Sequence, residues 1–141
     1  MKRDRRWIIV APLIAVLLLP ACREAASDES GGSEPVKLEP IEGTDLTRVI
    51  LTARAAERVG IETAPVASAG DRTTVPAAAV FFDPNGEEWV YTNPEPLVFV
   101  REAVSVDRFE GDVAVLSDGP PAGTEVVTVG VAELIGSEFG V

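Results

Sequence analysis

The chain contains one cysteine, Cys22, and this count limits how the fold can be stabilised. A single thiol cannot form an intramolecular disulfide, so the folded state has to depend on its hydrophobic core. From about Leu46 to Val141 there are 96 residues, enough for one small domain and too few for a second independent core. The sequence therefore predicts one domain that is stabilised by apolar packing.

The position of Cys22 indicates export. A basic segment, residues 1–6, precedes an apolar run from Trp7 to Leu19, and Pro20, Ala21 and Cys22 follow. This is the layout of a secretory signal peptide. The apolar run would form a helix of about 22 Å up to Ala21, which is shorter than the membrane's hydrocarbon core of about 30 Å. We therefore predict that residues 1–21 are a signal peptide and not a membrane span.

The last four residues of this run, 19–22, resemble the bacterial lipobox. The resemblance implies that the signal is cut between Ala21 and Cys22 and that the Cys22 thiol then carries a diacylglycerol. Two acyl chains anchor a protein stably where one chain is marginal. We expect a lipid anchor at the extracytoplasmic face of a membrane. The alternative interpretation is a small buried thiol at the end of an uncleaved helix.

The net charge of the chain argues against nucleic acids as partners. Removing residues 1–21 would change the formal net charge from -11 to -14, because that segment carries four bases and one acid. Proteins that bind nucleic acids need clustered lysines and arginines to displace counterions from phosphates, and no such cluster follows Cys22. The same acidity opposes electrostatic docking on anionic lipid, which leaves the acyl chains as the expected membrane contact.

Residues 22–45 are predicted to be a lipidated N-terminus and a disordered acidic linker. From position 23 to 45 there are seven acids and two bases, with few residues that could anchor a core. A flexible coil of this length would span about 25 to 30 Å. The expected domain, residues 46–141, would therefore stay near the membrane surface.

The first local signals of this domain indicate a short strand followed by a helix. Val49 to Leu51 reads as the strand, and Thr52 can cap a helix over Ala53–Val59 that ends at Gly60.

After Gly60 the pattern changes to alternation and to β-branched residues. Asp83-Pro84-Asn85-Gly86 is typical of a type I turn and predicts a hairpin between Ala78–Phe82 and Glu88–Thr92. A helical turn over Ala132–Ile135 is expected to end before Gly136. The other predicted strands are Ile61–Val66, Thr73–Val75, Leu97–Val106, Asp112–Leu116 and Glu125–Val129. We expect a mainly β fold, a small antiparallel barrel or sandwich of six to seven short strands with one short helix.

Several segments of this domain are similar to one known family, the periplasmic adaptor (membrane fusion) proteins of resistance-nodulation-division efflux systems. The upstream segment is similar to an element near the start of the mature adaptors, and the others are similar to their C-terminal part. These segments are 55–66, 75–80, 89–91, 99–106, 111–116, 121–127 and 130–134.

The resemblance implies the membrane-proximal domain of the adaptors, a permuted SH3-like β-fold that packs on the pump. Full adaptors carry a lipoyl-like domain, a helical hairpin and a β-barrel domain between the two matched regions, whereas here only Ala67–Thr73 intervenes. Without the hairpin we do not expect contact with an outer-membrane channel. The implied partner is an integral membrane transporter.

The residue types present offer little catalytic chemistry. The chain has no histidine, and after removal of the signal peptide it would have no methionine and no cysteine except Cys22. The usual zinc and copper ligands and most nucleophile-base pairs are thus missing. Asp83–Glu88 superficially resembles a calcium loop, but Pro84 and Gly86 favour a turn. We expect a non-enzyme with no catalytic residue, no cofactor and no metal.

Two further sets of residues have both a functional and a structural interpretation. Paired acids could support glycoside hydrolysis, but they fall beside predicted turns, where acids are usually solvated. Aromatic residues could form a ligand platform, but alternation within strands favours core packing. The acids are Glu87, Glu88, Asp107, Glu110 and Asp112, and the aromatic residues are Trp89, Tyr91, Phe99 and Phe109.

Three functions therefore stay open at this point. The first is a non-catalytic lipoprotein with an efflux-adaptor-like domain that contacts a membrane transporter. The second is an extracytoplasmic lipoprotein unrelated to efflux, which binds a peptide, glycan or small ligand at an exposed strand edge or at the loop Ser117–Gly123. The third and weakest is a hydrolase that uses surface carboxylates. A homo-oligomer is compatible with each.

Overall fold

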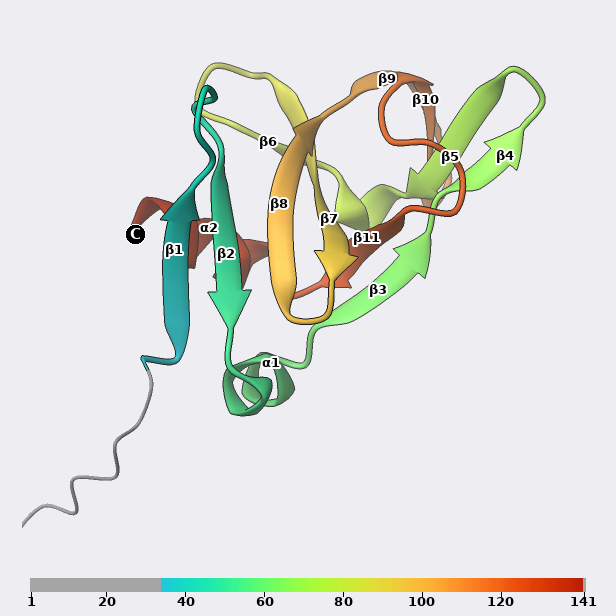
Figure 1. Ribbon diagram of the computed structural model, residues 1–141. Coiled ribbons are helices and arrows are strands. Elements are labelled where there is room, and N and C mark those ends of the chain that lie inside the picture. The colour runs from blue at the N-terminus through green and yellow to red at the C-terminus, as the bar shows by residue number, and fades with distance from the viewer. Residues whose placement is uncertain (1–33, 141) are drawn as a thin grey trace, which may run out of the picture. The chain divides into compact units, whose positions relative to one another are not determined.

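The structure is a computed structural model and describes residues 34–140 (Figure 1). Ala21 and Cys22, and with them the predicted cleavage and lipidation sites, lie outside the described residues. Among residues 34–140, no helix has the length and apolar character needed to cross a membrane.

The described residues form eleven strands, two α-helices and one 3₁₀ turn. In chain order these are β1 Val36–Pro40, β2 Thr47–Leu51, α1 Ala53–Val59, β3 Glu62–Pro65, β4 Ala67–Ala69, β5 Arg72–Pro76, the 3₁₀ turn η1 Ala77–Ala79, β6 Phe81–Phe82, β7 Glu88–Glu95, β8 Val98–Ala103, β9 Ser105–Glu110, β10 Val113–Asp118, β11 Glu125–Val129 and α2 Val131–Phe139.

The strands build two antiparallel sheets, which confirms the mainly β prediction. The first, sheet A, has the order β1-β2-β8-β7-β11-β3, with β6 also paired to β7. The second, sheet B, has the order β4-β5-β10-β9. Figure 1 shows β1, β2, β8 and β7 side by side, with the β4–β5 hairpin at the other end of the fold. Neither sheet closes on itself, so of the two predicted arrangements the barrel is not formed.

Helix α1 begins and ends at the predicted residues. The Thr52 hydroxyl accepts a hydrogen bond from the Ala55 N–H at 3.2 Å and so satisfies one free donor of the first turn. Gly60 takes a left-handed conformation (φ 73°) and donates its N–H to Ala56 O, the arrangement that favours glycine at this position.

The predicted turn over residues 83–86 is also confirmed. Gly86 N–H donates to Asp83 O at 3.0 Å, and the Asp83 carboxylate accepts the N–H groups of Asn85 and Glu87 at 2.8 Å each. The preceding strand is shorter than predicted, because η1 takes up residues 77–79 and leaves only β6, Phe81–Phe82, to pair with β7.

The linker prediction is wrong for residues 36–40, which form β1. This strand pairs antiparallel with β2 from Val36 opposite Leu51 to Pro40 opposite Thr47. Its stability comes from the backbone ladder with β2 and from Val36, which packs against the core, rather than from a run of apolar residues. The folded part thus includes residues before the predicted boundary at Leu46.

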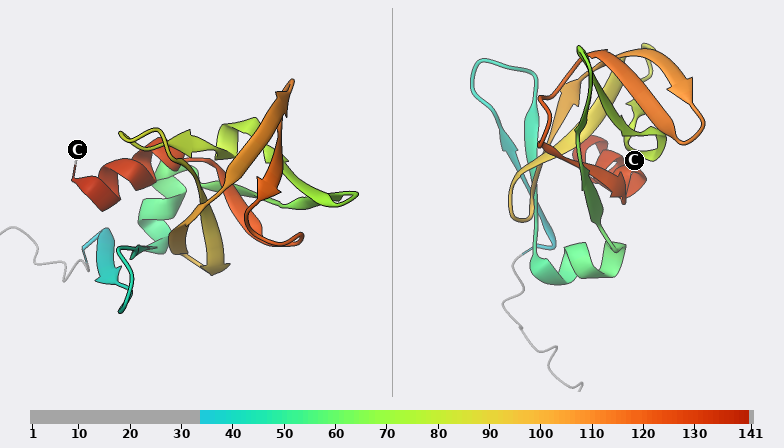
Figure 2. Two further views of the ribbon diagram at one scale, coloured as in Figure 1. Left: turned by 90° about the horizontal axis from the view of Figure 1, so that it is seen from above. Right: turned by 90° about the vertical axis from the view of Figure 1, so that its right-hand side faces the viewer.

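Two further predicted boundaries are corrected. The expected strand Leu97–Val106 is divided between β8 and β9 at Val104, which is buried and donates its N–H to Glu88 O at the start of β7. The expected last turn at Ala132–Ile135 is a longer helix, α2, which continues through Gly136 to Phe139. Figure 2 shows α2 beside the first strands and away from the β4–β5 hairpin.

The interior consists of two clusters, and strands β7 and β11 contribute to both. Successive side chains of a strand point to opposite faces, so Val90 and Val126 reach one cluster while Tyr91 and Val127 reach the other. We call the first the aliphatic core; its buried members are Val66, Val75, Ala79, Val90, Val104, Ala114, Leu116 and Val126. We call the second the mixed core; its buried members are Val49, Leu51, Ala55, Phe81, Tyr91, Phe99, Val127 and Leu134.

Candidate functional site

The most distinctive chemistry of the described residues surrounds Arg101 on β8. Its side chain is only 13% exposed, and its Nε lies 3.0 Å from Oε1 of Glu138, whose side chain is 3% exposed. Arg101 Nε has no hydrogen-bond partner among the described residues, so charge rather than a directed bond joins the pair. Arg101 Nη2 also donates to the backbone oxygen of Asp45 at 3.3 Å. One guanidinium therefore connects β8, α2 and the β1–β2 connection.

The second oxygen of the Glu138 carboxylate is bound from the mixed core. Tyr91 on β7 is fully buried and donates its hydroxyl to Glu138 Oε2 at 2.6 Å. Burial, followed by this hydrogen bond to an acid, raises the Tyr91 pKa above its ordinary range. Tyr91 therefore acts as a permanent donor, and the end of α2 is held by two interactions from the sheet.

Two aromatic rings cover the guanidinium of Arg101. Its central carbon lies 4.6 Å from the centroid of the Trp89 ring and 5.2 Å from that of Phe139. Both distances are within the range of a cation–π interaction. Phe139 itself is 49% exposed, so the covered cation lies directly beneath a surface aromatic residue.

Two hollows lie next to this arrangement and share the wall formed by Asp83, Pro84 and Phe139. The apolar hollow has a volume of about 240 Å³ and is otherwise lined by Phe81, Phe82 and Ile135. The polar hollow has a volume of about 400 Å³ and is otherwise lined by Asp45, Leu46, Asn85, Glu87, Trp89 and Arg101. We call the two hollows with their shared wall the aromatic groove.

Three carboxylates, those of Asp45, Asp83 and Glu87, line the polar hollow. Burial opposes ionisation of Asp83, but the hydrogen bonds from the Glu87 and Asn85 amides outweigh it and lower the pKa of this acid below its ordinary value. Asp45 and Glu87 are exposed, and in the described part of the chain neither forms an ion pair. The side of the groove that contains Arg101 is therefore acidic overall.

Most of the aromatic residues considered for a ligand platform lie apart from one another in the structure. Tyr91 and Phe99 are buried in the mixed core, as the packing interpretation predicted. Phe109 is exposed on β9 in sheet B and lines neither hollow. Of the four aromatic residues considered from the sequence, only Trp89 lines the aromatic groove.

The candidate acids are likewise separated. Asp107 and Glu110 both pair with Arg108, at 2.8 Å and 2.6 Å, and Glu88 accepts the backbone N–H of Val106 at 2.7 Å. Glu87 alone lines the groove. Within residues 34–140, no group of three or more acids, cysteines or histidines could hold a metal ion, and the hydrogen bonds of the 83–86 turn give Asp83 a structural role.

The loop Ser117–Gly123, considered as a binding loop, packs against the aliphatic core at its centre. Pro120 is fully buried, and a side chain at Gly119 would come within 3.0 Å of Val104 Cγ1. Gly123 N–H donates to Val66 O at 2.8 Å. These contacts fasten the loop to the fold. The exposed strand edges that the same hypothesis considered are β1 and β3 in sheet A, and β4 and β9 in sheet B.

Sequence reasoning missed Glu138, Phe139 and the role of Arg101. A signal was present in the helical spacing, since Leu134 and Glu138, and Ile135 and Phe139, lie four residues apart and share faces of one helix. Gly136 concealed it, because glycine usually marks the end of a helix. The pairing of Arg101 with a residue 37 positions later has no local signal.

Comparisons with protein-family models, with curated proteins and with solved structures gave no match to this chain.

Proposed function

We propose that this protein is a non-catalytic, membrane-anchored docking protein. It is a lipoprotein held by Cys22 at the extracytoplasmic face of a membrane, and its β-domain contacts an integral membrane transporter as an accessory subunit of efflux. The resemblance of residues 49–141 to the membrane-proximal domain of efflux adaptors supports a transporter as the partner. The two-sheet antiparallel fold is compatible with that resemblance.

The observation that carries the docking role is the exposed aromatic surface beside the groove. Phe82 is 57% exposed and Phe139 is 49% exposed, and both line the apolar hollow. Exposed apolar side chains that gather at one place mark interaction sites more often than isolated ones do. Aromatic anchors next to a pocket are also typical of residues that dominate binding energy in protein interfaces.

Crosslinking in native membranes tests this function. A photoreactive amino acid replaces Phe82, and the crosslinked product is purified under denaturing conditions. We expect a polytopic transporter subunit covalently joined to the lipoprotein. The matched control carries the same group at Phe109, which is similarly exposed on sheet B. Recovery of intact lipoprotein with no transporter subunit from either position would contradict the proposal.

The anchor is tested separately. Cys22→Ala is expected to leave the precursor uncut or to release the protein from membranes. Mass spectrometry of the native N-terminal peptide is expected to give Cys22 with a diacylglycerol, and a mature N-terminus without lipid would contradict the lipoprotein assignment.

A second candidate function is the binding of a small ligand, independent of efflux. The polar hollow of about 400 Å³ favours it, because small-molecule sites have volumes of about 300 to 1,000 Å³. A stabilising small molecule found by thermal-shift screening, together with no crosslinked membrane partner, would favour this function over the first.

A further inference from the structure

The aromatic groove combines two chemistries that meet at one wall. On one side of Phe139 and Pro84, the hollow is formed by Phe81, Phe82 and Ile135 and is apolar. On the other side the walls include the exposed carboxylates of Asp45 and Glu87. An occupant that fills both hollows therefore needs an apolar group and a polar group close together.

The charge of that polar group follows from the groove. Asp45, Asp83 and Glu87 contribute three carboxylates, and Arg101 contributes one cation. The charge of Arg101 is already offset by Glu138 at 3.0 Å, and two rings cover its guanidinium. Complementary charge is what selects partners and speeds their association. The acids of the groove thus favour a cationic group.

The size of the apolar hollow favours an anchoring side chain over a free small molecule. At about 240 Å³ it lies below the volume of small-molecule sites, which begin at about 300 Å³. Side chains of a partner that enter such a pocket, surrounded by contacts that exclude water, are the usual hot spots of protein interfaces.

We propose that the aromatic groove binds a segment of a partner protein in which one large apolar side chain lies next to lysine or arginine. The apolar side chain enters between Phe82 and Phe139, and the basic side chain pairs with Asp45 or Glu87. This inference rests on the proposed docking function and names the chemistry of the transporter segment that is recognised.

Two other occupants fit the charges less well. A second copy of this chain in a symmetric contact would bring two acidic groove rims together, and the chain carries a net charge of -11. The surface of an anionic membrane would be repelled by the same carboxylates. A basic segment of another protein is the occupant that both hollows accept.

A peptide panel tests the inference directly, with the full-length lipoprotein in nanodiscs of phosphatidylcholine. Three short fluorescein-labelled peptides are compared by anisotropy: one has leucine and phenylalanine between lysines, one has glutamate in place of every lysine, and one has alanine in place of both apolar residues. We expect the first to bind at least about ten-fold more tightly than the others, and its affinity to fall as salt rises.

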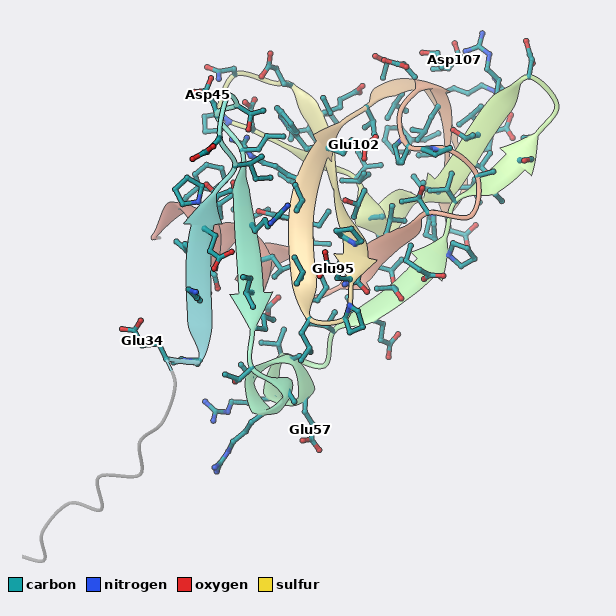
Figure 3. All side chains as sticks on the ribbon, in the orientation of Figure 1. Glu34, Asp45, Glu57, Glu95, Glu102 and Asp107 are labelled. Carbon is teal, nitrogen blue, oxygen red and sulfur yellow. The ribbon has the colours of Figure 1, made fainter. Side chains whose placement is uncertain are left out.

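Matched variants locate the binding. Phe82→Ser is expected to weaken the first peptide by about ten-fold, whereas Phe109→Ser, on sheet B, leaves binding unchanged. Glu87→Lys weakens it as well, whereas Glu57→Lys on α1 does not. Figure 3 shows Glu57 on α1, at the opposite end of the sheet from Asp45. Each changed side chain is exposed, so thermal unfolding of all four variants is expected to match that of the wild type.

Several results would overturn the inference. These are no binding of the first peptide, equal binding of the acidic peptide, and equal loss in the Phe82 and Phe109 variants. A dimer in sedimentation that dissociates on Phe82→Ser would assign the groove to a second copy. Loss of binding of the detergent-solubilised protein to phosphatidylcholine vesicles on the same change would assign the groove to lipid.

The inference and the proposed function can fail independently. A transporter crosslinked in membranes, with no peptide bound, would keep the docking function and reject the apolar-and-basic segment as what the groove recognises. Peptide binding that depends on Phe82, with a crosslinked partner that is not a transporter, would keep the groove and reject the efflux role.

Discussion

The two faces of β7 and β11 differ in chemistry although they lie on the same strands. The aliphatic core is built from valine, alanine and leucine. The mixed core adds stacked Phe81 and Tyr91, with ring centroids 5.0 Å apart, and the Glu138–Arg101 pair at its border. Apolar burial stabilises both, but a buried ion pair contributes little net stability compared with apolar residues of similar volume. In the mixed core, the Glu138–Arg101 pair therefore serves mainly to position the residues of the aromatic groove.

Both faces also include a partly or fully buried carboxylate of β8 or α2, and only one of these two carboxylates has a cation beside it. On the mixed side, Glu138 receives a hydrogen bond from Tyr91 and the charge of Arg101. Glu102 on β8 is half-buried, and burial, together with the negative charge of Asp118, raises its pKa. Figure 3 shows Glu102 on β8. A carboxylate without a cation destabilises the fold when it ionises, whereas a paired one can organise a site.

The largest expected effect comes from the aliphatic core. Leu116→Ala removes a fully buried side chain and should lower the free energy of unfolding by about 3 kcal/mol, through lost burial and the cavity left behind. Chemical denaturation measures it. The control is Leu38→Ala on β1, where the exposed side chain should cost about 0.5 kcal/mol or less. Peptide affinity of folded Leu116→Ala should match the wild type, and a weakened affinity would contradict the separation of the two sides.

The next effect comes from the ion pair. Glu138→Gln leaves the Arg101 charge without its partner and should cost about 2 kcal/mol, since breaking a buried pair costs more than the pair contributes. Peptide binding should weaken as well, because Phe139 and the Asp45 carbonyl are both positioned through Arg101. The double variant Arg101→Met, Glu138→Met should recover most of the unfolding free energy without restoring the binding. Recovery of both would indicate that the pair does not position the groove.

A smaller loss is expected for Tyr91→Phe. The ring keeps its place beside Phe81, but Glu138 Oε2 loses its donor, which should cost about 1 kcal/mol. In the Glu138→Gln background the same change should cost less, because the two residues act on one carboxylate. A double-mutant cycle in denaturant measures the coupling, and full additivity would contradict a shared network.

Local signals account for what the sequence could predict. Thr52 and Gly60 define α1, and Asp83, Pro84 and Gly86 define the 83–86 turn, through bonds that close within a few residues. Strand β1 could not be found this way, because its partner β2 lies beyond a turn and the strand itself has few apolar residues.

The candidate site was out of reach for a similar reason. Its residues come from the β1–β2 connection, β6, the 83–86 turn and the residue after it, β7, β8 and α2, and only tertiary packing brings them together. Glu138 is far in sequence from both Tyr91 and Arg101. The resemblance to efflux adaptors implied a partner and covered Trp89 and Arg101, but it gave a binding role to none of these residues.

The smallest predicted effect is the pH dependence at Glu102. The raised pKa of Glu102 in the folded state means that the folded protein favours the protonated acid. The stability that this group contributes is therefore fully present below its unfolded-state pKa of about 4.3. It is lost as the pH rises through the higher folded-state pKa. Glu102→Gln removes this loss. Its stability relative to the wild type should therefore rise from pH 4 to pH 7, by about 0.5 kcal/mol or less. Denaturation at the two pH values measures the difference, and a fall would contradict the direction.

The alternation along β7 also constrains how the chain folds. A shift of β7 by one residue would turn Tyr91 toward the aliphatic core and Val90 toward the mixed core, so that misalignment would damage both interiors at once. Because this strand contributes buried residues to both interiors, we expect the loss of one interior to destabilise the other. Unfolding should therefore be a single cooperative transition, with fluorescence and circular dichroism giving the same midpoint.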